Sequence, residues 1–140
     1  MIRVVMAGEP IGKGRPRFSR ATGTVYTPEK TARYEERLAW AAQSVMAGRQ
    51  LLDGPLVVTV RAHMSIPASK PGKWKAAALA GETRPTKKPD LDNFAKCLDA
   101  LNKVVWVDDS QIVLLHVEKH WTDQPRIEIT VDKLSPSIML

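Results

Sequence analysis

The chain has 140 residues, a formal net charge of +6, a sequence pI near 9.7 and 44% hydrophobic residues. These values predict a single domain spanning residues 1–140 and a polyanionic partner. A single cysteine, Cys97, excludes an intramolecular disulfide. No stretch reaches the roughly 20 apolar residues of a membrane-spanning helix, and the first residues lack a signal-peptide cleavage pattern, so we expect a cytoplasmic protein.

The amino-terminal half predicts three extended segments and one helix. Extended segments are expected at residues 2–7 and 24–26, separated by a loop rich in glycine, proline and cations. Thr27-Pro28 predicts a helix start, because threonine can cap and proline suits the first helical position. Apolar residues then recur at helical spacing until Gly48. Residues 56–66 alternate apolar and polar side chains, the pattern of a half-buried strand.

The carboxyl-terminal half predicts a helix after Asp90 and then two strands. The apolar face of this helix consists of Leu91, Phe94, Ala95, Leu98 and Leu101. Strands are expected at 112–121 and 126–131, and their short connection favours an antiparallel hairpin. A short helix is also predicted at 73–79. The resulting fold class is α+β (mixed α/β), a small mixed sheet with helices packed on it, with Trp40, Trp106 and Trp121 in the core.

Four aspartates bracket the helix that follows residue 90. Asp90 and Asp92 stand at its start, and Asp108 and Asp109 follow its end. Carboxylates are the ligands that Mg²⁺ prefers, so this grouping predicts a metal site. The alternative is that these residues only cap helices and turns. Lys96 is one helical turn from Asp92. It either stabilises negative charge on a reacting phosphate or forms an ordinary ion pair with Asp92. Asp99 and Lys103 have the same spacing and could form a second such pair.

Two basic segments are candidates for contact with DNA phosphates. The first is the glycine- and proline-rich loop, and the second is the stretch 70–88, whose last lysines adjoin Asp90. Such cations provide binding that is independent of base sequence, although a charged loop can also serve solubility alone. The predicted DNA-binding residues are Lys13, Arg15, Arg17, Arg20, Lys73, Lys87 and Lys88.

The aspartate segment resembles the RusA-type Holliday junction resolvases, which are small endonucleases of bacteria and phages. The chain has the D-x-D-N-x-x-K, D-A-L and D-D-S-Q-I elements of that family between residues 90 and 112. The segments GEPIGKGRPRF and VYTPEKTARYEE are similar to the opening of many phage-type members. The resemblance therefore extends over most of the chain.

The resemblance implies a homodimer that cuts four-way DNA junctions symmetrically during recombination and repair. In this reading Asp90, Asp92 and Asp109 bind Mg²⁺, with Mn²⁺ as a substitute, and Lys96 assists the chemistry. Neighbouring groups that would contact these residues are Asn93, Asp108 and Gln111. Two alternatives remain open: a branched-DNA or flap nuclease of broader specificity, and a junction-binding protein without catalysis.

Trp74 and the histidines have no assigned role. Some members of the resembled family carry an aromatic wedge just before the aspartates, whereas here Trp74 is the nearest upstream aromatic residue. His63, His116 and His120 do not predict a zinc site, because positions four apart on one strand are separated by roughly 13 Å.

Overall fold

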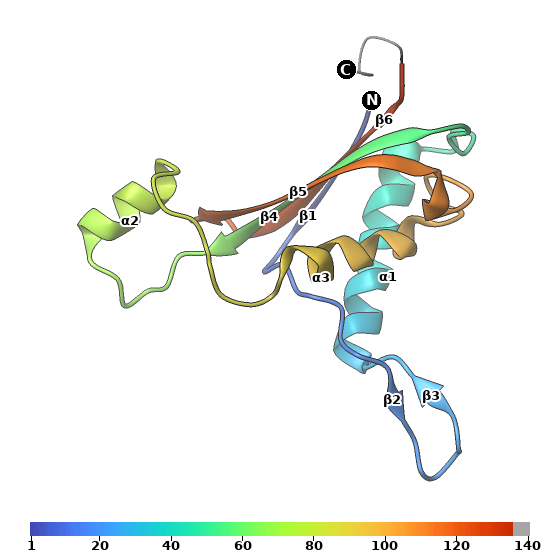
Figure 1. Ribbon diagram of the computed structural model, residues 1–140, viewed down its shortest axis with the longest axis horizontal. Coiled ribbons are helices and arrows are strands. Elements are labelled where there is room, and N and C mark those ends of the chain that lie inside the picture. Colours follow the sequence, from blue (N-terminus) through green and yellow to red (C-terminus); the bar gives the residue numbers. More distant parts are fainter. Residues whose placement is uncertain (136–140) are drawn as a thin grey trace.

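A computed structural model describes residues 1–135 and places a four-stranded mixed sheet at the centre of the fold (Figure 1). The sheet consists of β1 (Ile2–Ala7), β4 (Leu56–Ser65), β5 (Ile112–Thr122) and β6 (Arg126–Lys133), in the order β1-β6-β4-β5. Strands β4 and β5 are parallel, and the other pairs are antiparallel. A separate hairpin of β2 (Arg17–Phe18) and β3 (Val25–Tyr26) projects from this body.

The helices confirm the mixed α/β expectation. They are α1 (Glu29–Met46), α2 (Gly72–Leu79) and α3 (Leu91–Ala95), and α3 continues directly into the 3₁₀ helix η1 (Lys96–Leu101). A second 3₁₀ turn, η2 (Asp109–Gln111), leads into β5. None of the helices within residues 1–135 is long and apolar enough to cross a membrane.

The core lies between one face of the sheet and the helices α1 and η1. Val58 and Val60 of β4 point into it, together with Leu38 of α1 and Leu101 of η1, and all four are fully buried. The predicted alternation of β4 is confirmed, because every second residue from Leu56 to Ala62 is buried. At roughly 25 cal/mol per Å² of buried apolar surface, this cluster is the main stabilising element of the domain.

The predicted hairpin of the last two strands is wrong. Strand β4 lies between β5 and β6, so that Val58 is opposite Leu115 on one side and Val131 on the other. The connection between β5 and β6 therefore crosses the end of β4. A span of two strand spacings is about 10 Å, which three extended residues can reach. A short connection alone consequently does not distinguish adjacent strands from strands separated by one neighbour.

The predicted helix boundaries need two corrections. Helix α1 begins at Glu29, and no side chain caps it, so Thr27 does not have the predicted capping role. The helix after Asp90 is α-helical for only five residues before it tightens into η1. The tighter winding changes which side chains face inward. Cys97, within η1, is consequently buried. Leu91, predicted on the apolar face, lies in the first turn of α3 and is 41% exposed.

The three tryptophans predicted in the core have different environments. Trp106 is completely buried, and its indole N–H donates a hydrogen bond to Asn102 Oδ1 at 2.7 Å. Trp40 lies on the outside of α1 and is 67% exposed, so its core assignment was wrong. Trp121 is partly buried and packs edge to face with Trp74, with ring centroids 5.7 Å apart. Trp74 thus fastens α2 to β5.

Candidate active site

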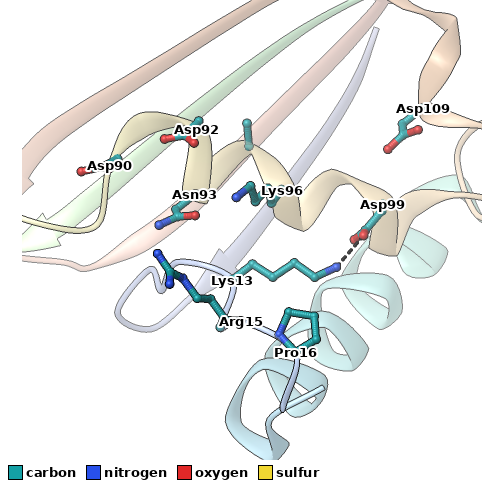
Figure 2. A pocket seen from close by; sticks show the side chains of 11 residues that line it. Lys13, Arg15, Pro16, Asp90, Asp92, Asn93, Lys96, Asp99 and Asp109 are labelled. Carbon is teal, nitrogen blue, oxygen red and sulfur yellow. Dashed lines mark hydrogen bonds and ion pairs between the residues drawn. The ribbon is translucent and has the colours of Figure 1, made fainter. Parts of the chain in front are cut away.

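The aspartate helix and the amino-terminal basic loop enclose one open cavity of about 560 Å³ (Figure 2). The cavity brings together three of the four predicted aspartates and Lys96. Its lining residues are Lys13, Gly14, Arg15, Pro16, Asp90, Asp92, Asn93, Ala95, Lys96, Asp99 and Asp109. Segments separated by more than 70 residues in the sequence therefore form a single polar site.

Asp90 and Asp92 are presented by the first turn of α3. Asp90 occupies the N-cap position in an extended conformation, but its carboxylate makes no capping hydrogen bond. The turn-and-cap interpretation therefore does not account for this side chain. Hydrogen bonds from strand β5 anchor the loop that precedes Asp90. Lys119 Nζ donates to the Lys87 carbonyl at 2.9 Å and to the Pro89 carbonyl at 3.0 Å. Lys119 thereby fixes the residue immediately before Asp90.

The amino-terminal loop packs tightly on the start of the same helix. The Lys13 amide donates to the Asn93 carbonyl at 3.3 Å. A Cβ atom at Gly12 would lie 2.9 Å from Pro89 Cβ and 3.2 Å from Asn93 Cβ, closer than side chains normally pack. Glycine at position 12 therefore permits the close approach that closes this side of the cavity.

Asp108 and Asp109 have different positions. The Asp108 carboxylate accepts a hydrogen bond from the Ser110 amide at 3.0 Å and caps η2. Hydrogen bonding from the Ser110 side chain and then from this amide lowers the pKa of Asp108. Asp109, in contrast, lines the cavity. Gln111 completes the capping box, and its amide group also donates to the carbonyls of Leu52 and Gly54. Asp108 and Gln111 thus shape the turn that presents Asp109 and do not line the cavity.

Lys96 is exposed on the cavity wall and lies between Asn93 and Asp99 along the helix (Figure 2). Within residues 1–135 it forms no ion pair with Asp92, and Asp99 forms none with Lys103. The ordinary helix-surface pairs that the spacing allowed are therefore absent from the described chain. The Lys96 ammonium remains available to an anionic substrate.

An ion-pair network that the sequence did not reveal lies at the other end of the cavity. Lys13 Nζ is 2.6 Å from Asp99 Oδ2 and 3.4 Å from Glu35 Oε2. Burial, followed by the adjacent Asp99 carboxylate, raises the pKa of Glu35 to about 7. Burial also disfavours ionised Asp99, but hydrogen bonds from Glu35 and Lys13 outweigh it, and the pKa of Asp99 is lowered. Glu35 is therefore the member of the pair that holds a proton near neutrality. No sequence signal links residues 86 positions apart.

We expect Glu35→Gln to flatten the pH dependence of stability. The usual pKa of this side chain is near 4.5, so between that value and about 7 the folded protein retains a proton that the unfolded chain releases. Unfolding free energy must therefore fall as pH rises through this window. Urea unfolding at about pH 5 and pH 8 should show a smaller fall for Glu35→Gln than for wild type. Glu36→Gln, on an exposed neighbour, is the control; an equal fall in both variants would contradict the assignment.

The three predicted ligands fit a hard divalent cation by their donor chemistry. Asp90 and Asp92 stand together at one end of the cavity, and Asp109 faces it from beyond the helix (Figure 2). Within the described chain, no three acidic, histidine or cysteine side chains already converge on one point as an ion site. Mg²⁺ commonly uses only one or two carboxylates and keeps several waters. The residues present are consistent with that kind of coordination.

Of the seven predicted DNA-binding residues, two line the cavity and five lie outside it. Arg15 lines the cavity, Arg17 belongs to β2, and Arg20 lies in the connection of the projecting hairpin. Lys73 is in the first turn of α2, and Lys87 and Lys88 precede the aspartates in the loop. All of these side chains except Lys13 are exposed. Lys13 is partly buried by its two carboxylate partners.

Comparison with known proteins agrees with this arrangement. The family model "Endodeoxyribonuclease RusA" matches residues 7–132. The chain is also 36% identical over 139 residues to "Uncharacterized protein YqaN" of Bacillus subtilis (strain 168), covering 96% of this chain and 97% of that protein. The family match includes both basic segments and all the aspartates of the cavity. The chain therefore belongs to the RusA endodeoxyribonuclease family.

Proposed function

We propose that the protein is a Mg²⁺-dependent, structure-specific endodeoxyribonuclease that resolves four-way Holliday junctions by symmetric hydrolysis. The observation that carries the proposal is the single cavity lined by Asp90, Asp92, Asp109 and Lys96 in a chain of this family. Carboxylates and a free ammonium in one open cavity are the groups that phosphodiester hydrolysis requires.

In this proposal Asp90, Asp92 and Asp109 hold the metal. When bound, Mg²⁺ supplies an activated water and neutralises charge on the phosphate. Water oxygen forms a new bond to phosphorus, and the bond from phosphorus to the leaving sugar oxygen breaks. The Lys96 ammonium, which has no ion-pair partner within residues 1–135, stabilises the negative charge that develops there. Arg15 on the opposite wall orients the phosphate through its guanidinium.

The basic residues around the cavity provide affinity for DNA backbone. Lys87 and Lys88 adjoin the aspartates, and Arg17 and Arg20 belong to the β2–β3 hairpin, which projects from the body of the fold (Figure 1). These exposed cations would follow two different arms of a branched substrate. Because contacts from such cations to phosphates carry no sequence information, we expect binding that depends on shape and salt more than on base sequence.

A homodimer is part of the same proposal. A four-way junction has two symmetric strands to cut, which a twofold protein with two cavities matches. Strand β5 is an edge strand of the described sheet, and its residues Val113, Leu114 and Leu115 are 53%, 39% and 45% exposed. Apolar side chains on an open sheet edge favour association with a second copy. Light scattering of the purified protein should therefore give twice the mass of the chain.

The test is cleavage of a labelled four-way junction with Mg²⁺, with Mn²⁺ and without divalent metal. A flap substrate and a linear duplex of matching sequence are run alongside. We expect paired nicks in the junction only when metal is present, and an intact duplex. Equal cleavage of the flap would favour the broader branched-DNA nuclease, and tight junction binding without cleavage would favour the binding protein.

A further inference from the structure

A second cavity lies at the far ends of β4 and β5, next to α2, and shares no lining residue with the aspartate cavity. Its volume is about 250 Å³. The side chains that give it chemical character are His63, Arg84, His120, Trp121, Thr122 and Arg126. No carboxylate is among its lining residues. The cavity therefore presents only cationic, neutral and hydrogen-bonding groups.

The acidic residues behind this cavity are paired with its lining residues His63, His120 and Arg126 and with two arginines outside it. Glu118 accepts a hydrogen bond from Arg61 Nε at 2.8 Å. Glu128 accepts from Arg126 Nε at 2.9 Å and from Arg3 at 3.2 Å. Arg84, on the cavity wall, makes no hydrogen bond or ion pair with any residue in the described part of the chain. The positive charge of Arg84 is thus uncompensated.

Two buried nitrogen atoms of the lining residues have no hydrogen-bond partner. These are Trp121 Nε1, which finds no acceptor within residues 1–135, and His63 Nε2, which lies 3.7 Å from Glu128 Oε2 and pairs with it when protonated. The His63 ring stacks on His120, with centroids 5.1 Å apart and planes 21° apart, so stacking holds it against the cavity. An indole N–H can only donate, and a buried donor without an acceptor is costly. Trp121 Nε1 therefore favours a ligand rich in acceptor oxygens.

We propose that this cavity binds a phosphate group. A phosphate offers acceptor oxygens for Trp121 Nε1 and negative charge for Arg84, which is unpaired in the described chain, and charge-assisted hydrogen bonds to a guanidinium are strong. The volume exceeds that of one phosphate, so part of a nucleotide also fits. The ligand is either free phosphate or the backbone of DNA, and the two sources share this chemistry.

The position of Arg84 favours the DNA backbone. Arg84 is six residues before Asp90, and the exposed Lys87 and Lys88 lie between them. One continuous segment thus joins the second cavity to the start of the aspartate helix. A strand leaving the catalytic cavity along these lysines would bring a more distant phosphate to Arg84. This assignment of the source rests on the proposed function, whereas phosphate binding itself does not.

The first experiment titrates inorganic phosphate while NMR follows the imidazole signals of His63 and His120. We expect saturable shifts in wild type, and about tenfold weaker binding in Arg84→Gln and in Trp121→Phe, which lose one charge and one N–H donor, respectively. Arg49→Gln and Trp40→Phe make the same changes at exposed positions elsewhere, and they should bind phosphate like wild type. Equal affinity in all variants, or no saturable shift, would overturn the proposal.

The second experiment measures junction affinity as a function of salt without divalent metal. If DNA supplies the phosphate, Arg84→Gln should weaken binding about tenfold and reduce the salt slope by about one, relative to Arg49→Gln. Phosphate binding with unchanged junction affinity would overturn the DNA assignment and identify free phosphate as the ligand. A wild-type protein that binds phosphate but never cuts junctions would instead refute the proposed function alone.

Discussion

Asp92→Asn is expected to lower the rate of junction cleavage by about 10³-fold or more while leaving junction binding intact. Asn has the same shape as Asp but lacks the charge that a hard cation requires. The Asp92 side chain is exposed and makes no hydrogen bond within residues 1–135, so folding should not suffer. Single-turnover cleavage with saturating enzyme separates this chemical defect from a binding defect.

The matched control for this substitution is Asp123→Asn. Asp123 is exposed in the short connection between β5 and β6 and does not line the aspartate cavity. The same loss of charge there should leave cleavage near the wild-type rate. If Asp92→Asn cleaves junctions at the wild-type rate, Asp92 is not a metal ligand and the proposed mechanism is wrong.

Trp106→Ala is expected to cost about 3–5 kcal/mol of unfolding free energy, the usual range for a large aromatic residue removed from a core. Trp106 is completely buried, and its indole N–H is bonded to Asn102. Removing the ring creates a cavity and leaves the Asn102 carbonyl oxygen without this donor. Urea unfolding followed by circular dichroism measures the change.

Trp40→Ala provides the comparison, because the same side chain is removed from the exposed face of α1. Surface substitutions usually change stability by less than about 1 kcal/mol. Similar losses for the two variants would contradict the burial described for Trp106, or would show that Trp40 is covered in an oligomer. Measuring both variants over a range of protein concentrations distinguishes these two explanations, because oligomer stability depends on concentration.

Local patterns in the sequence predicted most of the elements. Strand β1 has the predicted bounds Ile2–Ala7, and β4 and α2 differ from their predictions by one residue at one end. These elements depend on side-chain alternation and turn residues that are close in sequence. The grouping of Asp90, Asp92 and Asp109 around one cavity also follows from local spacing, because a single short helix separates them.

Other features depend on contacts between distant residues and had no local signal. The order of the strands places β4 between β5 and β6, although the short connection suggested that those two strands pair. Trp40 is an exception, because it falls opposite Leu38 and Ala42 on α1, so helical periodicity already indicates its exposure, whereas the burial of Trp106 depends on packing. The Lys13–Asp99 pair and the His63–His120 stack likewise join separate segments.

The sequence by itself determined the family pattern, the basic charge, the mixed α/β class and the set of acidic residues at the site. These are properties of composition and short-range spacing, which a single segment can encode. Only the tertiary structure showed that Asp99 also lines the cavity and that Asp108 caps the turn that presents Asp109. It also brought Lys13 to Asp99, gave Glu35 its raised pKa, and assembled the cationic cavity beside α2. Each of these depends on burial and on partners far apart in the chain, and folding alone supplies both.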